Sequence, residues 1–361
     1  MATPRVTELR PNPDGYSYDE VKPLARLALQ AGLSVLLRGH PGVGKSTLAR
    51  ELADELNLPL HDIRLAQREP AELCVVHFPD RERQTLQLLP PDWVRAVCDA
   101  PGFVFLDEIN AAVTRLHQAA AYQIVLERRV GPFRFHPQTV VLAAGNLDDD
   151  NAIVSPLSSA LNNRFVHLRL RVDAAAWVRW AESAGLHASV VGYIGGRGKF
   201  GAETLYEPNG DDAFPTPRSW EMASRLLSHA SDADVRRVVA ACVGIPAAEK
   251  FQTWHKMQTR VDPRLIVEKG KVIDFKRMEP SAAYAHVWVV SDYVLQRESL
   301  AEAFLPNIAR FLASEGLDPE LRFIFLRRLD AVPDLLTRLK RQPDFQTVAA
   351  ELVDLHMEAI A

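Results

Sequence analysis

Eight residues near the start of the chain have the types and spacing of a phosphate-binding loop. Residues 39–46 read Gly-His-Pro-Gly-Val-Gly-Lys-Ser, which fits the pattern G-x-x-x-x-G-K-[ST]. Glycines let backbone N–H groups turn towards a phosphate, and a helix starting at Gly44 adds the positive end of its dipole. The side chain of Lys45 can reach the β- and γ-phosphates, and the hydroxyl of Ser46 can ligate Mg²⁺. The residues predicted to hold the nucleotide are Gly39, His40, Pro41, Gly42, Val43, Gly44, Lys45, Ser46 and Thr47.

Two acids follow the apolar run Gly-Phe-Val-Phe-Leu at residues 102–106. A buried strand ends in this way when its carboxyl end reaches a ligand crevice. Asp107 is then placed to hold Mg²⁺, directly or through water, and Glu108 to polarise an attacking water. A carboxylate beside the metal suits attack by water, so the pair predicts hydrolysis. The alternative interpretation is that Asp107 and Glu108 only cap the next helix.

A third apolar run, at residues 140–144, ends in Gly145 and Asn146. The amide of Asn146 could orient the attacking water or touch the γ-phosphate. An asparagine after a glycine is also a common turn former, which is the alternative interpretation.

Apolar runs and helical spacings predict the elements that position these residues. Leu48, Leu52 and Leu56 follow the phosphate loop at helical spacing. Alternation of strands with helical stretches over residues 34–170 favours a parallel sheet covered by helices, an α/β fold. The predicted strands are Val35–Leu37, Pro59–Leu65, Phe103–Leu106, Thr139–Ala144 and Phe165–Leu170.

Beyond residue 170 the pattern becomes helical. Asp173 and Ser231 are predicted to cap helices there, and residues 195–212 to form a Gly-rich loop. Residues 265–273 are predicted to form a small hairpin, and residues 17–31 a helix that precedes the sheet. The predicted divisions are 1–33 N-terminal lead-in, 34–170 α/β domain, 171–260 α-helical lid and 261–361 mostly helical C-terminal region.

The composition is that of an ordinary globular protein. The chain has 361 residues, 47% hydrophobic and 24% charged, which is enough for two or three domains. A net charge of −4 argues against broad nucleic-acid binding. Cys74, Cys98 and Cys242 fit no metal site and favour a reduced, cytoplasmic setting. No apolar signal segment and no run of 18 apolar residues occurs, so no membrane span is expected.

The motifs together resemble those of AAA+ ATPases, and the chain is most similar to the MoxR branch over about residues 20–230. The resemblance implies a P-loop NTPase (AAA+) parallel sheet with helices on both faces, then an all-α lid and a mostly helical C-terminal region. The motifs that carry it, in the order of that superfamily, are the phosphate loop, Asp107-Glu108, Asn146, Asn162-Asn163-Arg164-Phe165 and Pro217-Arg218-Ser219.

The resemblance also implies a role for each matching residue. Lys45 and Ser46 correspond to Walker A, Asp107 and Glu108 to Walker B, and Asn146 to sensor 1. The implied cofactors are ATP and Mg²⁺. The predicted metal ligands are therefore Ser46 and Asp107, and the predicted catalytic residues are Glu108, Asn146, Arg164 and Arg218.

Two of these residues supply positive charge, which the chemistry of phosphoryl transfer also needs. Arg164 corresponds to the arginine finger that is presented to a neighbouring subunit, and Arg218 to sensor 2 in the lid. The alternatives are a surface salt bridge for Arg164 and a solvated first-turn arginine for Arg218. Arg128 and Arg129 are a less favoured source of charge for a neighbour.

The MoxR resemblance implies an insert at about residues 68–91 and a hairpin at about residues 129–139. Many relatives carry an acidic, glycine-containing segment before the arginine finger, whereas residues 147–157 are acidic but lack glycine. An arginine finger acting in trans requires a ring of copies, and the family implies a hexamer. The implied partner is a protein client, with a von Willebrand factor A domain protein as the expected example.

The leading functional hypothesis is an ATP-driven, chaperone-like machine that remodels or activates a protein. A metalloenzyme activase of the same superfamily is one alternative, and a nucleic-acid motor is another because of Arg129 and Arg134. A small-molecule kinase should lack the equivalents of Arg164 and Arg218. A GTPase is disfavoured because the sequence has no Asn-Lys-x-Asp segment, and an inactive structural ring because Glu108 is intact.

Overall fold

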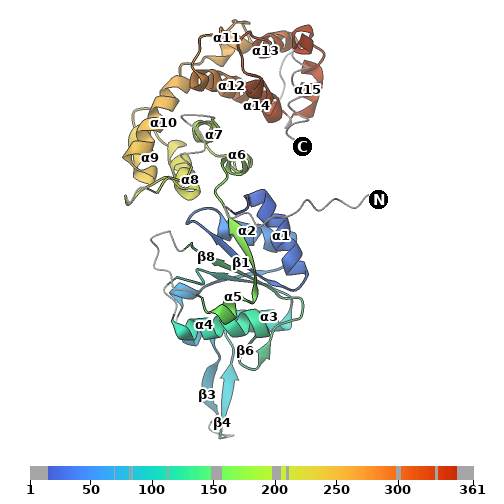
Figure 1. The fold of residues 1–361 in the computed structure, drawn as a ribbon, viewed down its shortest axis with the longest axis vertical. Coiled ribbons are helices and arrows are strands. Elements are labelled where there is room, and N and C mark those ends of the chain that lie inside the picture. The colour runs from blue at the N-terminus through green and yellow to red at the C-terminus, as the bar shows by residue number, and fades with distance from the viewer. Residues whose placement is uncertain are drawn as a thin grey trace. The chain divides into compact units, whose positions relative to one another are not determined.

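The computed structural model divides the chain into two compact units, Met1–Ala176 (unit 1) and Trp177–Ala361 (unit 2) (Figure 1). Unit 1 holds a parallel sheet, and the described part of unit 2 is built from helices. The finer domain limits drawn from the sequence stay predictions. The described residues are 15–68, 70–80, 82, 84–111, 114–147, 157–196, 205–208, 211–297, 302–329 and 332–347.

Five parallel strands form the sheet of unit 1, in the order β2-β5-β8-β1-β9. Because all five strands run the same way, the segments that follow β1, β5 and β8 meet at the carboxyl edge of the sheet. The strands are β1 Ser34–Gly39, β2 Leu60–Arg64, β5 Phe103–Asp107, β8 Val140–Gly145 and β9 Phe165–Leu170. Each overlaps a strand predicted from the sequence, and the predicted α/β class is confirmed.

Alternating side chains of the strands build a hydrophobic core on each face of the sheet. In β5, Phe103 and Phe105 lie in one core cluster, and Val104 and Leu106 lie in the other. The first cluster includes residues of α1 and α2, and the second includes residues of α3, α4 and η3. The prediction of helices on both faces is thus confirmed. The elements are α1 Tyr18–Gln30, α2 Lys45–Glu55, α3 Asp92–Asp99, α4 Arg115–Tyr122, the π-helical turn η3 Gln123–Glu127 and α5 Ser159–Asn162.

The helix α1 begins where the sequence predicts, because Ser17 and Glu20 form a capping box. The backbone N–H of Ser17 donates to Glu20 Oε2 at 2.7 Å, and the N–H of Glu20 donates to Ser17 Oγ at 3.4 Å. Two first-turn donors that the helix itself leaves unpaired are satisfied in this way.

Two antiparallel hairpins belong to unit 1 (Figure 1). The strands β3 Val76–Asp80 and β4 Thr85–Leu89 form the first, within the expected insert, after the short turns η1 Leu65–Gln67 and η2 Pro70–Leu73. The strands β6 Arg129–Val130 and β7 Phe133–Arg134 form the second.

The second hairpin is shorter than the expected range of residues 129–139. Phe135 is only 6% exposed, so the chain turns inward directly after β7. Thr139 is also buried, and its hydroxyl donates to the carbonyl of Val97 at 3.3 Å. The residues after β7 therefore lead back to the sheet and do not extend the hairpin.

Helices are the regular elements of the described part of unit 2. Asp173 caps α6 as predicted, because its Oδ1 accepts from the backbone N–H of Ala176 at 2.9 Å. The prediction that Ser231 caps a helix is wrong, since α9 starts at Val235 and the Ser231 hydroxyl donates to Asp234. The helices are α6 Ala174–Ser183, α7 Ala188–Gly195, α8 Pro217–Leu227, α9 Val235–Val243, α10 Ile245–Gln258, α11 Pro263–Val267, α12 Pro280–Leu295, η5 Glu302–Phe304, α13 Leu305–Leu312, α14 Pro319–Leu329 and α15 Pro333–Leu339.

The hairpin predicted at residues 265–273 is wrong. The helix α11 occupies the start of this range, and residues 268–273 form no strand. Asp262 accepts from the N–H of Arg264 at 3.0 Å and Pro263 takes the first helical position, so the segment opens as a capped helix. Ile266 and Val267 are then buried on a helical face.

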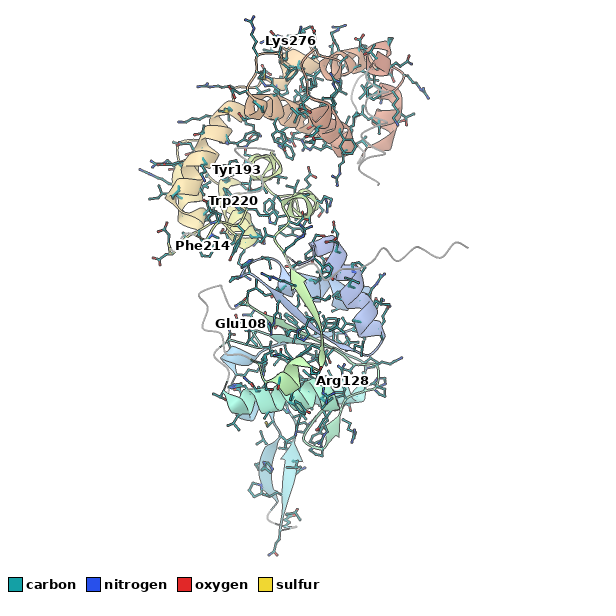
Figure 2. The ribbon with its side chains drawn as sticks, in the orientation of Figure 1. Glu108, Arg128, Tyr193, Phe214, Trp220 and Lys276 are labelled. Atoms are coloured by element: carbon teal, nitrogen blue, oxygen red, sulfur yellow. The ribbon has the colours of Figure 1, made fainter. Side chains whose placement is uncertain are left out.

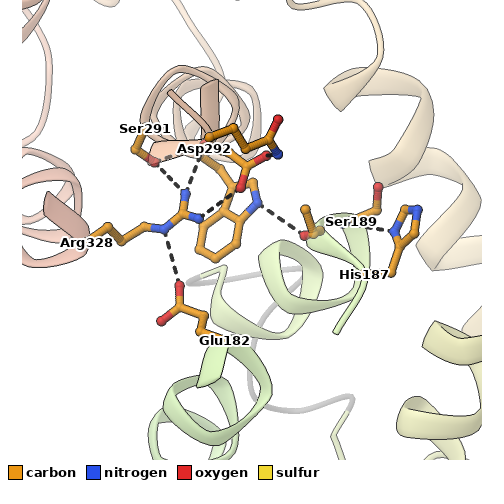
Figure 3. A network of polar contacts seen from close by, with 9 residues as sticks. Glu182, His187, Ser189, Ser291, Asp292 and Arg328 are labelled. Carbon is orange, nitrogen blue, oxygen red and sulfur yellow. Dashed lines mark hydrogen bonds and ion pairs between the residues drawn. The ribbon is translucent and has the colours of Figure 1, made fainter. Parts of the chain in front are cut away.

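One arginine ties together three helices of unit 2 (Figure 3). The guanidinium of Arg328 on α14 contacts Glu182 on α6 at 3.2 Å and Asp292 on α12 at 3.3 Å. It also lies over the ring of Trp288, 3.5 Å from the centroid, and donates to that residue's carbonyl. Because α6 precedes residue 260 and the other two helices follow it, the predicted lid and C-terminal region share this packing.

Some predictions fall on residues outside those that the structure describes. The acidic segment lies almost wholly at 148–156, and most of the Gly-rich loop lies at 197–204 and 209–210. Among the residues that are described, no helix has the length and apolar character needed to span a membrane.

Candidate functional site

Three segments that the sequence singled out meet at the carboxyl edge of the sheet in unit 1. The ammonium of Lys45 donates to Asn146 Oδ1 at 2.9 Å, and the hydroxyl of Ser46 donates to Asp107 Oδ2 at 3.0 Å. Figure 2 places Glu108, the next residue after β5, in the same unit. Because these contacts span 101 and 61 residues of sequence, only the parallel sheet brings the groups together.

The phosphate loop joins β1 to α2 and has the conformation that its glycines allow. Gly44 has φ +99°, a left-handed conformation that residues with a Cβ rarely adopt. The helix α2 begins at the next residue, so its unpaired N–H groups and positive dipole end face the loop. The ring of Tyr18 on α1 packs behind this turn, since a Cβ added to Gly44 would lie 3.5 Å from its Cε2.

Lys45 is only 9% exposed and is held inside its own loop. Besides Asn146, its ammonium donates to the carbonyl of Gly39 at 2.6 Å and to that of His40 at 2.9 Å. All three donors of this buried cation thus have oxygen partners, which offset the cost of its desolvation. A phosphate oxygen has the same acceptor chemistry as the carbonyl oxygens that this ammonium contacts.

The hydroxyl of Ser46 and the carboxylate of Asp107 form a pair of oxygen donors. Asp107 is 9% exposed, and its second oxygen, Oδ1, accepts from the backbone N–H of Glu108 at 2.9 Å. Hydroxyl and carboxylate oxygens are the ligands that Mg²⁺ prefers in proteins. These two residues therefore have the right chemistry for a magnesium site.

Glu108 adopts a strained backbone conformation directly beside that pair. Its φ is +55°, which few residues other than glycine show. Strain of this kind costs of order 1–3 kcal/mol and is found mainly where the surrounding structure fixes a functional residue. Its side chain is half-buried, so the carboxylate is accessible from solvent.

Asn110 is a polar residue of this region that the sequence reasoning missed. It is 3% exposed, and its side-chain amide exchanges two hydrogen bonds with the backbone of Asn146. In the sequence, an asparagine two residues after an acid pair indicates only a turn. Its residue type does not reveal a hydrogen-bond partner 36 residues away.

Arg164 lies at the surface of unit 1 on a firmly held backbone. Its N–H donates to the carbonyl of Leu161 at 3.1 Å, and Leu161 is fully buried. Asn162, two residues earlier, accepts from Arg38 of β1 at 3.3 Å. The side chain of Arg164 is exposed to solvent.

Arg218 belongs to unit 2 and is the second residue of α8. Thr216 and Ser219 form a capping box around it, and the neighbouring Trp220 is fully buried. The side chain of Arg218 is exposed. The capping box thus fixes the start of the helix that carries Arg218.

Two arginines near the second hairpin, Arg128 and Arg129, have partners inside unit 1. Arg129 contacts Glu127 at 2.5 Å and donates to the carbonyl of Gly131 at 3.1 Å. Arg128 donates to the carbonyl of Gly32, just before the amino end of β1, and burial lowers its pKa to about 10. Because these contacts are internal, neither residue is a good source of charge for a neighbouring subunit or for nucleic acid.

A family comparison agrees with this fold and site. Residues 35–170 match the model of the AAA family, the ATPase family associated with various cellular activities. The match starts in β1, ends with β9 and includes the phosphate loop, the acid pair and Asn146. The five-stranded sheet of unit 1 and the loops at its carboxyl edge are therefore the part of the chain that is similar to an AAA ATPase domain.

Curated relatives resemble only part of the chain. It is 34% identical over 106 residues to the ATP-dependent zinc metalloprotease FtsH 9 of Arabidopsis thaliana, covering 29% of this chain and 11% of that protein. It is 37% identical over 78 residues to a candidate 26S proteasome regulatory subunit homologue of Methanothermobacter thermautotrophicus, covering 22% of this chain and 18% of that protein. The chain thus spans less than a fifth of the length of either relative.

Two solved structures align with most of the chain at low similarity. One is a candidate ATPase from Cytophaga hutchinsonii, with 15% identity, a TM-score of 0.36 and coverage of 92% of this chain and 79% of the other. The other is a mutant RuvB from Thermotoga maritima, with 17% identity, a TM-score of 0.37 and coverage of 78% and 87%.

Proposed function

We propose that this protein is a MoxR-like AAA+ ATPase that hydrolyses ATP to remodel or activate a protein partner. The observation that carries the proposal is the contact of Lys45 with Asn146 and of Ser46 with Asp107, beside Glu108, at one edge of a parallel sheet. The groups that we assign to the phosphates, the metal and the attacking water thus lie close together.

The residues present fit ATP and Mg²⁺. Ser46 and Asp107 offer oxygen ligands to the metal, and the loop at residues 39–46 with the start of α2 offers N–H donors to the phosphates. Magnesium, when bound, neutralises charge on the phosphate oxygens. Lys45 then exchanges its carbonyl partners for phosphate oxygens, while Asn146 stays close to the γ-phosphate.

Glu108 is the residue that we assign to the water. Its carboxylate orients a water molecule for attack on the γ-phosphorus and accepts a proton as the new P–O bond forms. The bond from the γ-phosphorus to the oxygen shared with the β-phosphate breaks, which gives ADP and inorganic phosphate. Asn146 fixes the second side of that water or of the γ-phosphate.

Two arginines complete the proposed site. Arg164 is exposed on an anchored backbone, as a group that serves a neighbouring subunit must be. Arg218 stands at the start of α8, and we assign it the sensor 2 role by family resemblance. An arginine that acts in trans requires heterologous contacts that close into a ring, so we propose a homo-oligomeric ring, a hexamer by family resemblance.

The hairpin β3–β4 is the surface that we assign to the protein client. Val76, Phe78 and Leu86 on it are each more than half exposed. Apolar side chains of this size in open solvent commonly mark a contact with another protein. We propose a von Willebrand factor A domain protein as a partner, and a cytoplasmic setting, which the three free thiols support.

Replacing Glu108 with glutamine tests the reaction directly. Glu108→Gln keeps the shape and the nucleotide contacts but removes the proton acceptor. We expect phosphate release to fall about 10²–10⁴-fold while ATP affinity is retained. A radiolabelled or colorimetric phosphate assay measures the first quantity, and a fluorescent ATP analogue measures the second.

The matched control is Glu249→Gln, which changes an exposed glutamate on α10 that pairs only with Arg236 among the residues described. This variant should turn over ATP as the wild type does. Full turnover by Glu108→Gln would show that another group activates the water, and absence of ATP binding by the wild type would refute the proposed function.

A further inference from the structure

Asn110 is a buried amide next to the proposed site, and the roles assigned so far do not use it. It lies in the turn after β5, two residues beyond Glu108, and is 3% exposed. Its Nδ2 donates to the carbonyl of Asn146 at 2.9 Å, and its Oδ1 accepts from the N–H of Asn146 at 3.1 Å. One side-chain amide thus satisfies both backbone groups of a single residue.

These two hydrogen bonds extend the pairing of β5 with β8 beyond the last pair of strand residues. The pairing of β5 with β8 ends at Leu106 and Ala143. The N–H of Ile109 then donates to the carbonyl of Ala144 at 2.9 Å, and Asn110 makes the next two bonds. The side chain of Asn110 therefore makes the hydrogen bonds to β8 that a further residue of β5 would make, at a point where the chain has already left the sheet.

The glycine before Asn146 is fitted to this arrangement. A Cβ added to Gly145 would lie 2.6 Å from Asn110 Oδ1, a distance that real Cβ atoms do not show. The close approach of the amide to the backbone thus depends on the missing side chain of Gly145. Such close contact indicates that the Asn110 side chain is tightly packed in one position, as in a protein interior.

Asn110 joins two groups that must act on one water molecule. Along the chain it is two residues from Glu108, whose φ of +55° needs support from its surroundings. Across the sheet it holds the backbone of Asn146, whose Oδ1 accepts from Lys45 at 2.9 Å. Any shift of this amide would change the distance between the carboxylate and the Asn146 side chain.

We propose that Asn110 is a positioning residue for ATP hydrolysis, which holds Asn146 in register with the turn that carries Glu108. The inference rests on the proposed function, because it concerns the same site. Asn110 is buried, and it acts through its two hydrogen bonds to the backbone of Asn146. A misplacement of about 1 Å in such a site can cost about 10²-fold in rate.

A double-mutant cycle with Asn146 tests this role. We expect Asn110→Ala to lower kcat roughly ten- to a hundredfold, with a KM for ATP within about threefold of wild type. Asn146→Ala should lower kcat by itself. In the Asn110→Ala/Asn146→Ala double variant, kcat should match that of Asn146→Ala, because the group that Asn110 positions is already gone.

Two further variants keep the test decisive if Asn110→Ala does not fold. Asn110→Asp keeps the size and the acceptor but loses the donor to the Asn146 carbonyl. It can therefore replace Asn110→Ala in the double-mutant cycle with Asn146→Ala. Gly145→Ala keeps both asparagine residues but adds a Cβ that would clash with Asn110 Oδ1. This clash should separate the two asparagines and lower kcat in the same way. The matched control is Asn307→Ala, which removes an amide-to-backbone bond in unit 2 and should leave kcat unchanged.

Each outcome bears on the inference separately from the proposed function. Wild-type kcat in Asn110→Ala, or rate losses that multiply in the double variant, would overturn the positioning role. A Kd for a fluorescent ATP analogue that rises in step with the loss of kcat would also overturn it, because a purely structural role has that signature. Absence of ATP turnover by the wild type would instead refute the proposed function.

Discussion

At the scale of single residues, we expect Lys45 to contribute strongly to the proposed nucleotide binding. Its ammonium is buried and already directed at three oxygen atoms, those of Gly39, His40 and Asn146. Little conformational entropy is then lost when a phosphate takes one of these places. The loop is therefore pre-organised by its own carbonyls.

We predict that Lys45→Ala weakens ATP binding about a hundredfold or more, because each charge-assisted hydrogen bond contributes about 1.5–3 kcal/mol. Titration with a fluorescent ATP analogue measures the change. The control is Lys22→Ala on α1, which removes a lysine that pairs with Glu51 and Glu55 and should bind ATP as the wild type does. Wild-type affinity in Lys45→Ala would contradict the assignment of the loop.

At the scale of elements, β5 and β3 differ in how far their side chains are buried. Phe105 on β5 is 1% exposed and lies in the core beneath the sheet, whereas Phe78 on β3 is 56% exposed. The first strand holds the acid pair in place, and the second belongs to a hairpin that a partner can reach. The same residue type thus serves stability in one strand and, by our proposal, binding in the other.

We predict that Phe105→Ala destabilises unit 1 by about 3–5 kcal/mol, because it leaves a cavity in a packed core. Phe78→Ala should change the free energy of unfolding by no more than about 0.5 kcal/mol, as exposed positions usually do. Denaturant unfolding followed by circular dichroism measures both. Equal losses in the two variants would mean that the hairpin β3–β4 is packed against another part of the chain.

At the scale of the whole molecule, our proposal implies that a single subunit lacks one group that the reaction needs, the arginine of its neighbour. Arg164 is exposed, and no described residue of its own unit pairs with it. Charge stabilisation by such an arginine is worth roughly 10³–10⁵ in rate, so a lone subunit should be a very slow enzyme. Turnover should therefore rise with protein concentration as the ring assembles.

We predict that Arg164→Ala is inactive alone and that mixing it with Lys45→Ala chains restores part of the activity. In the mixed ring, a subunit with an intact phosphate loop receives Arg164 from a neighbour that cannot itself bind ATP. Steady-state ATPase assays over a range of mixing ratios measure the recovery. Failure at every ratio, with mixed rings demonstrated by mass spectrometry, would rule out action in trans.

The candidate site was largely predictable because its chemistry is local in sequence. The phosphate loop is one stretch of residues 39–46, and the acid pair follows one apolar run, so each carries its own signal. Asn110 was not predictable, since its partner is far along the chain and its residue type suits many turns. The hairpin at residues 265–273 failed for a related reason: a run of β-branched residues favours a strand, but Asp262 and Pro263 start a helix.

The sequence alone predicted the α/β order of elements, which the structure confirms, and it indicated the ligand class and the residues that we assign to the phosphates. Each of these depends on residue type and short spacing. Only the tertiary structure decided which strands are neighbours, and therefore that Lys45 reaches Asn146 and Ser46 reaches Asp107. It also decided that Arg128 and Arg129 are occupied within their own unit. Such contacts join residues far apart in the chain, so they arise from packing, which no short pattern encodes.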